Sequence, residues 1–173
     1  MRGLRYLAVP AIIAVAIGLS ACAETTVVPA ATNAPAAGFA NMKNGSEEDF
    51  ILNVGRRTYF AAGSAEIDET ARLTLDKQAE WLNANKGWKV KLQGFSDDPG
   101  TADANVTLSA KRAEAVMAYL ASKGVDPKRM WAKGYGKDRV IRDCADITCK
   151  SQNRRVITNL RDEFDGAAPQ VKG

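Results

Sequence analysis

A strand followed by a polar loop and a long helix is the feature that most limits how this chain can fold. Residues 88–93 place apolar side chains at every second position, with Lys or Gln between them, which is the period of a strand with one buried face. The Asp-Asp-Pro-Gly sequence at 97–100 breaks that pattern, as turn residues do. Apolar residues then recur at helical spacing from about Val106 until Gly124, which we expect to end the helix. The expected buried stripe of this helix is Leu108, Ala115, Val116 and Tyr119.

Two charged residues in this stretch are unusual. Asp97 stands where the strand ends, and Arg112 lies on the apolar stripe of the helix, four residues from Leu108 and from Val116. An arginine in that position must reach solvent or meet an anion, because burying it unpaired costs several kcal/mol. Two interpretations remain open. The first is a structural Asp97–Arg112 ion pair. The second is a site for a zwitterion, whose ammonium and carboxylate bind the two side chains, both of them partly solvated in the absence of ligand.

Several separated motifs surround these charges. Gly94 begins G-x-x-D, followed by G-T and then by N-x-x-L-S-x-x-R-A-x-x-V-x-x-Y-L, which ends at Leu120. The other motifs are YFAAGSAEID at 59–68, GVDPKRM and GYGKDRVI within 124–141, and QNRRVITNL at 152–160. In this order, over about residues 58–160, the chain resembles the C-terminal domain family of OmpA. Within that family it is most similar to the peptidoglycan-associated lipoproteins of the Tol–Pal system.

The resemblance implies a function and a set of site residues. Proteins of this family bind the diaminopimelate of the peptidoglycan stem peptide and tether the outer membrane to the cell wall, with roles in envelope integrity and cell division and with TolB as a partner. By motif position, Asp97 and Arg112 match the two ligand-binding charges of the family, and Asn105 matches its loop asparagine. Further backbone donors are expected at three consecutive residues, Gly63, Ser64 and Ala65.

Three positions depart from the family pattern. Phe95 stands where the family usually has histidine, and the chain contains no histidine. Ala104 replaces the aromatic residue that usually precedes the asparagine, and Gly63 replaces an Asp or Asn. Since Asp97 and Arg112 are both present, we expect binding to be retained.

The remaining folded region supplies the other elements of one domain. Ser46, which precedes three acidic residues, predicts a short capped helix, and Asp68 predicts the N-cap of a helix that runs to about Asn85. The inner face of that helix is expected to contain Ala71, Leu75, Ala79 and Leu82. Strands are expected at 58–60, near 130–133 and at 156–160, with a short helical turn near 150–154. The βαβαβ order predicts an α/β fold of the OmpA-like type, a two-layer sandwich in which helices pack on one mixed sheet.

The first 21 residues read as a lipoprotein signal peptide. Two arginines precede an apolar run that is too short and too poorly flanked to span a membrane. This run ends at Leu-Ser-Ala-Cys, which resembles a bacterial lipobox and implies that Cys22 is acylated. The alternative is an ordinary secretory signal followed by a chance cysteine. Ala23 after the cysteine implies transfer to the outer membrane, with the domain on its periplasmic face.

Composition separates the mature chain into three parts. Residues 22–45 are rich in Ala, Thr, Pro and Asn without periodicity, which indicates a flexible linker of roughly 80 Å when extended and roughly 27 Å as a coil. The folded domain is expected over 46–161, and 162–173 are expected to form a frayed tail. Removing the signal peptide leaves 22 basic and 20 acidic side chains. A net charge this small does not indicate a nucleic-acid partner.

The cysteines predict a disulfide and no other chemistry. Cys22 is assigned to the lipobox, which leaves Cys144 and Cys149 as a pair in an exported protein. Two cysteines without histidine make a poor metal site, and no cofactor is expected. Neighbouring loop aspartates without a histidine or a nucleophile motif do not indicate an enzyme. The alternatives to a wall-binding module are a protein–protein scaffold whose main partner is TolB, and a generic OmpA-like lipoprotein outside the Tol–Pal system.

Overall fold

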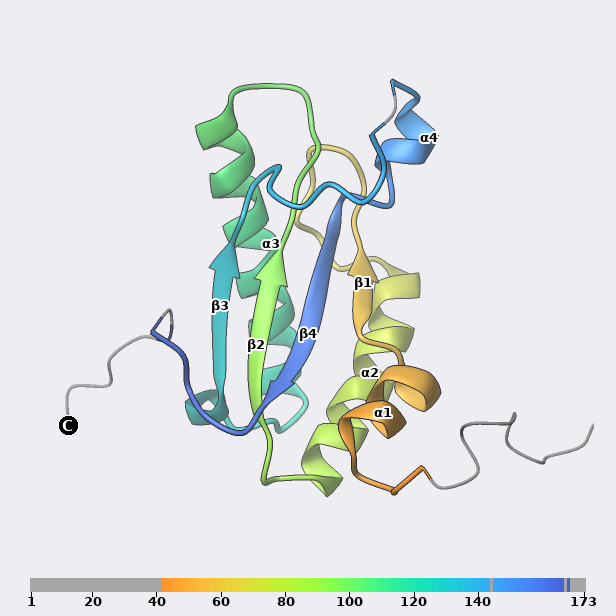
Figure 1. The fold of residues 1–173 in the computed structure, drawn as a ribbon, viewed down its shortest axis with the longest axis vertical. Helices are drawn as coiled ribbons and strands as arrows, with labels where there is room; N and C mark the ends of the chain where they lie inside the picture. Colours follow the sequence, from red (N-terminus) through yellow and green to blue (C-terminus); the bar gives the residue numbers. More distant parts are fainter. Residues whose placement is uncertain (1–41, 144, 167, 169–173) are drawn as a thin grey trace, which may run out of the picture.

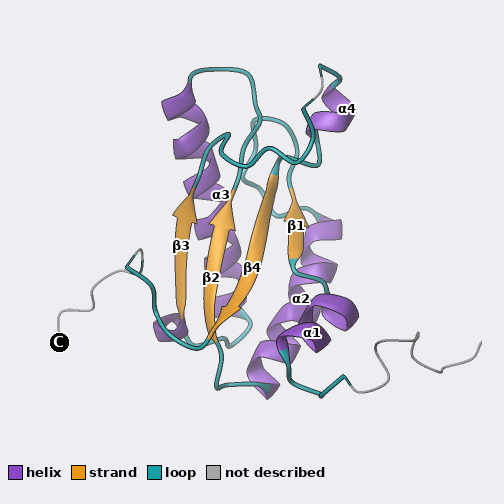
Figure 2. Cartoon of the chain, viewed as in Figure 1, coloured by secondary structure: helices purple, strands orange, loops and turns teal. Residues whose placement is uncertain are grey.

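One sheet with helices on a single face forms the domain (Figures 1 and 2). The structure is a computed structural model that describes residues 42–143, 145–166 and 168. The predicted signal peptide, Cys22 and most of the linker lie outside the described residues. Within the described part, no helix combines the length and the apolar composition needed to cross a membrane.

The sheet is mixed and has four strands. They are Arg57–Tyr59 (β1), Lys89–Gly94 (β2), Met130–Gly134 (β3) and Arg155–Arg161 (β4). Their spatial order is β1-β4-β2-β3, with β2 parallel to β3 and β4 antiparallel to both of its neighbours. The predicted fold class is therefore confirmed, and each predicted strand end lies within one residue of the observed one.

This topology brings three loops together. The ends of β1, β2 and β3 and the start of β4 lie at the same edge of the sheet, at the top of Figure 1. The loops that follow β1 and β2 and the long connection between β3 and β4 gather there. Residues that are far apart in the sequence thereby form one surface.

Helix α2, Glu69–Ala84, follows the prediction closely. Oδ1 of Asp68 accepts a hydrogen bond of 2.7 Å from the backbone N–H of Ala71, which caps the helix. Four apolar side chains of its inner face are buried against the sheet, as predicted: Ala71, Leu75, Ala79 and Leu82.

Helix α3, Ala102–Ser122, begins four residues earlier than predicted. Oγ1 of Thr101 caps it by accepting from the N–H of Ala104 at 3.2 Å. Of the predicted apolar stripe, Val116 is buried and Tyr119 packs half-buried against the core, whereas Leu108 and Ala115 are only half-buried. The buried positions of this helix are Asn105, Ser109, Arg112, Ala113, Val116 and Leu120. Three of these six are polar, and apolar periodicity does not single out Asn105 and Ser109 because their side chains are polar.

Helix α3 packs unusually close to the sheet because glycines face it. A Cβ atom built on Gly94 of β2 would lie 1.9 Å from the carbonyl oxygen of Ser109, and one on Gly134 of β3 would lie 2.5 Å from the backbone nitrogen of Ala110. Real side chains do not tolerate such distances. Two neighbouring strands therefore need glycine where this helix crosses them.

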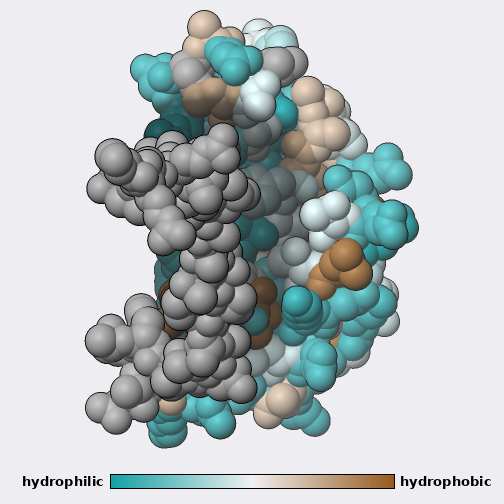
Figure 3. Space-filling view, turned by 90° about the vertical axis from the view of Figure 1, so that its right-hand side faces the viewer, coloured by the Kyte–Doolittle hydropathy of each residue, from teal (hydrophilic) through white to brown (hydrophobic). Residues whose placement is uncertain are grey.

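Short elements complete the domain. They are helix α1, Glu47–Asp49, a π-helical turn, Phe50–Val54, a 3₁₀ turn, Pro127–Arg129, and helix α4, Ile147–Lys150. Oγ of Ser46 caps α1, as predicted. The helical turn predicted near 150–154 lies earlier, because Asp146 caps α4 and residues 151–153 form turns before β4. Figure 3 shows the side of the domain that contains β1, α1 and α2. Most of the described residues visible on this side are hydrophilic.

The beginning of the predicted tail is held against the sheet. Phe164 packs on Trp131 with ring centroids 5.0 Å apart, and Asp165 forms an ion pair with Lys91. The Nε1–H of Trp131 also donates to Asp165. The prediction of a tail frayed from residue 162 onward is therefore wrong for its first residues.

Candidate functional site

Arg112 pairs with Asp98 rather than with Asp97. Its Nη1 lies 2.8 Å from Oδ2 of Asp98, and the two side chains are only 0% and 5% exposed. A structural Asp97–Arg112 pair, the first of the two interpretations, is absent from the described residues. The expectation of the second, that Arg112 is partly solvated without ligand, was wrong. The reason is that the backbone stays extended after β2 ends. Alternation continues, so that Ser96 and Asp98 point toward α3 and are buried while Asp97 points away.

The guanidinium of Arg112 also joins the loops that follow β1 and β2. Nε donates to the carbonyl of Ser64 at 2.7 Å, and Nη2 donates to the carbonyl of Ala61 at 3.0 Å. Nη1 makes a longer bond of 3.4 Å to the carbonyl of Phe95. Arg112 is therefore the residue through which α3 orders both loops.

Asp98 is stabilised as a carboxylate. The backbone N–H of Gly63 donates to Oδ1 at 2.6 Å, and Oγ of Ser96 donates to Oδ2 at 2.7 Å. Burial raises the pKa of Asp98, but the bonds from Arg112, Gly63 and Ser96 together outweigh it and leave the pKa below its ordinary value. The Gly63 amide predicted as a ligand donor is thus used by the protein. Ser64 contributes its carbonyl to Arg112, and Ala65 lies in the same loop, half-buried.

Asn105 shapes the loop, as predicted. Its Oδ1 accepts from the N–H of Asp98 at 3.0 Å, and its Nδ2 donates to the carbonyls of Asp98 and Thr101 at 3.1 and 2.9 Å. Oγ of Ser96 lies 2.7 Å from the same Oδ1. An asparagine is needed here because it both donates and accepts within one buried turn.

Asp97 occupies a separate environment. Its Oδ2 accepts a hydrogen bond of 2.8 Å from Nδ2 of Asn153, which is buried. The same Asn153 accepts from the N–H groups of Ile141 and Arg142 and donates to the carbonyl of Arg142. Asp97 itself is half-buried, and no ion pair is formed by it within the described residues.

Sequence reasoning missed Asn153 and the two arginines that follow it as site residues. Arg154 donates through Nε to the carbonyl of Phe60 at 3.3 Å. Burial lowers the pKa of Arg112, Asp98 opposes this, and the nearby charge of Arg154 lowers the pKa further. Arg155 lies 4.2 Å above the ring of Phe95. The QNRR segment supplied the signal for these residues, because an asparagine and two arginines at a strand start are unusual.

The three positions that depart from the family pattern are placed as follows. Phe95 is buried, and its ring stacks on Tyr135 at 5.5 Å on the sheet face away from the helices. Ala104 is exposed on the first turn of α3, and Gly63 is exposed with a φ of +68°. A groove of about 670 Å³ runs along β1 and the start of α2 and includes Phe60 and Ala61, the residues whose carbonyls bind Arg154 and Arg112.

The disulfide prediction is tested for only one of its cysteines. Cys149 is disulfide-bonded and half-buried in α4. Cys144 lies outside the described residues, so the Cys144–Cys149 pairing stays a prediction. Within the part of the chain that is described, no group of three or more metal-binding side chains occurs.

A sequence profile identifies the family directly. The profile of the OmpA family matches residues 59–154, which is more than half of the chain. The chain belongs to the OmpA family. The resemblance inferred from the motifs is thereby confirmed, and the family is one of non-enzymatic proteins, which agrees with the expectation that this OmpA-family member is not an enzyme.

Two similar proteins share one name. The chain is 39% identical to the peptidoglycan-associated lipoprotein of Agrobacterium fabrum over 154 residues, covering 87% of each chain. It is 43% identical to the protein of the same name from Mesorhizobium japonicum over 116 residues, covering 67% of this chain and 69% of that one.

Solved structures share the fold. The crystal structure of the peptidoglycan-associated lipoprotein from Burkholderia pseudomallei matches with a TM-score of 0.59 at 30% identity, covering 61% of this chain and 90% of that one. The C-terminal domain of Helicobacter pylori MotB matches with a TM-score of 0.56 at 25% identity, covering 63% of this chain and 84% of that one.

Proposed function

We propose that this OmpA-family protein binds peptidoglycan non-covalently by recognising the diaminopimelate of the stem peptide. The observation that carries the proposal is the environment of the Asp97 carboxylate. This carboxylate is half-buried, held by one amide from Asn153, and forms no ion pair within the described residues. A carboxylate positioned in this way can accept hydrogen bonds from an ammonium group of a ligand.

Arg112 has a role that differs from simple capture of a carboxylate. Its charge is balanced by the buried pairing with Asp98, which fixes the loops around Asp97, whereas nearby Arg154 forms no ion pair within the described residues. A ligand carboxylate bound near Arg154 would gain from its charge. Asn105 holds the loop after β2, and the N–H of Gly63 connects the loop after β1 to Asp98.

Sacculus binding by variants of Asp97 tests the proposal. Asp97→Asn keeps the shape of the side chain and should reduce pull-down with purified sacculi at least ~10-fold, since a charge-assisted hydrogen bond contributes about 1.5–3 kcal/mol. Asp103→Asn is the matched control, because Asp103 is an exposed aspartate in the first turn of α3. Equal sacculus binding by the two variants would show that Asp97 is not part of the binding site.

We also propose that acylated Cys22 anchors the protein to the periplasmic face of the outer membrane and that it acts in the Tol–Pal system, with TolB as a partner. Support comes from the lipobox and from the name shared by the relatives. In this arrangement the protein links the outer membrane to the wall and contributes to envelope integrity and cell division. Purified TolB should compete with sacculi if both bind the loop edge of the sheet, and simultaneous binding would place TolB elsewhere.

A further inference from the structure

The face of the sheet away from α2 and α3 is strongly basic, and the C-terminal segment around Phe164 covers part of it. Figure 1 shows this face toward the viewer, with α2 and α3 behind the strands. The four strands together contain six Lys or Arg residues and no Asp or Glu. Arg57 and Lys133 are exposed and Lys89 and Arg161 are half-buried, whereas Lys91 and Arg155 are only 7% and 3% exposed. The strand registers put all six on this face: Arg57, Lys89, Lys91, Lys133, Arg155 and Arg161. This set is called the basic face below.

Little within the described residues neutralises the basic face. Lys91 pairs with Asp165 of the C-terminal segment, and no ion pair involves the other five. Three cations surround the ring of Tyr135 at 5.4 to 6.0 Å from its centroid, namely Lys91, Lys133 and the loop residue Arg139. Helices α2 and α3, on the opposite side, contain five acidic residues against four basic ones, of which Arg112 is buried. The domain is therefore electrostatically two-sided.

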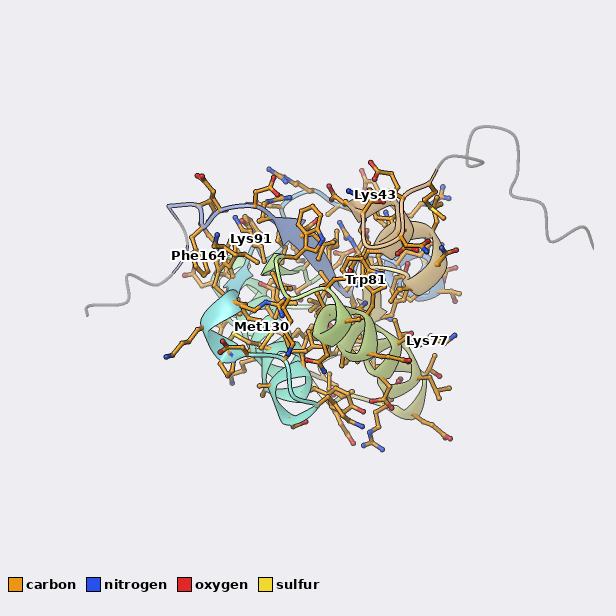
Figure 4. All side chains as sticks on the ribbon, turned by 90° about the horizontal axis from the view of Figure 1, so that it is seen from below. Lys43, Lys77, Trp81, Lys91, Met130 and Phe164 are labelled. Atoms are coloured by element: carbon orange, nitrogen blue, oxygen red, sulfur yellow. The ribbon has the colours of Figure 1, made fainter. Side chains whose placement is uncertain are left out.

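The chain outside the structure leaves from the basic side. Lys43, next to the first described residue, lies on the same side of the sheet as Lys91 and Phe164, whereas α2 and α3 fill the other side (Figure 4). About 20 residues separate Lys43 from Cys22, which corresponds to roughly 25 Å as a flexible coil. A lipid attached at Cys22 would hold the basic face within reach of the membrane surface at high effective concentration.

We infer that the basic face docks on anionic phospholipid headgroups of the membrane that holds the lipid anchor. The inference rests on the acylation of Cys22 in the proposed function. The exposed and half-buried cations of the basic face complement an anionic membrane surface, and one lipid attachment plus a basic patch is a general combination for membrane contact. The loops that follow β1 and β2 lie beyond the ends of the strands (Figure 1), and we expect them to stay outside the contact area.

Vesicle binding by charge variants tests the inference. The chain from Ala23 to Gly173 contains every described residue and is mixed with vesicles of phosphatidylcholine containing 30 mol% phosphatidylglycerol, or of phosphatidylcholine alone, at low salt. Each basic residue near an anionic membrane contributes about fivefold to the affinity. The triple variant Arg57→Gln, Lys133→Gln and Arg161→Gln should therefore bind the anionic vesicles on the order of 100-fold more weakly.

A second triple variant removes the same charge from the helical side. Arg72, Lys77 and Lys111 are exposed on α2 and α3, and their replacement by Gln should reduce binding less than threefold. An equal loss of vesicle affinity in both triple variants would overturn the inference. It would also be overturned if the parent chain showed no preference for the anionic vesicles, and that result would favour an acidic protein as the partner. Sacculus pull-down with the basic-face variant should be unchanged, so failure of wall binding and failure of membrane docking are distinguishable.

Discussion

At the scale of single residues, two adjacent aspartates have opposite environments. Asp98 is buried against Arg112, whereas Asp97 is half-buried and bonded to Asn153. Asp98→Asn should lower the free energy of unfolding by about 3 kcal/mol, because it leaves a buried arginine without its counter-charge. Asp97→Asn should change it by no more than about 1 kcal/mol. Urea unfolding at pH 7 measures both, and equal losses would contradict the assignment of Asp98 as the structural partner.

The carboxylate of Asp98 also makes the free energy of unfolding depend on pH. The pKa of Asp98 is lower in the folded state than its ordinary value, so its contribution is complete above the unfolded pKa of about 4 and is lost as the pH falls through the folded pKa. The stability difference between the parent chain and Asp98→Asn should therefore narrow below pH 4. Urea midpoints between pH 7 and pH 2.5 give this difference, and a constant gap would show that the carboxylate charge is not what stabilises Arg112.

At the scale of elements, the contact between α3 and the sheet limits which residues β2 can contain. Gly94→Ala should destabilise the fold by about 3 kcal/mol, because its Cβ would overlap the backbone of α3 at Ser109. Gly87→Ala is the control, since no atom lies within 4 Å of a Cβ built there, and it should be nearly neutral. Thermal melts of the two variants measure this difference in stability. Similar melting temperatures would mean that α3 can move away at little cost.

The loop before β4 is the other element with a testable covalent feature. Cys149 is disulfide-bonded, and Cys144 is its predicted partner. Because the loop is short, its disulfide should contribute about 2 kcal/mol. Alkylation of the exported protein with a mass tag should label these cysteines only after reduction. Two thiols that react without reduction would refute the pairing.

At the scale of the whole molecule, the proposed function assigns separate roles to a lipid anchor, a linker and the folded domain. In this proposal the domain binds the wall at one end of its sheet, and the linker sets how far the domain reaches from the membrane. We expect an alkyne fatty acid fed to cells to label the parent protein and not Cys22→Ser. Labelling of both proteins, or of neither, would contradict the acylation of Cys22.

The sequence by itself determined the order of elements, the strand limits to within one residue, the capped start of α2 and the family, because alternation, capping residues and motif order are local signals. It also placed Asp97, Asn105 and Arg112 in one region. Only the tertiary structure decided which aspartate meets Arg112, because the extended backbone beyond β2 directs alternate side chains to opposite faces. It likewise decided where α3 begins and which side of α3 is buried. Two further partners of Arg112 are carbonyls of the loop after β1, about 50 residues earlier in the chain, and a pattern within one segment contains no information about contacts made at that distance.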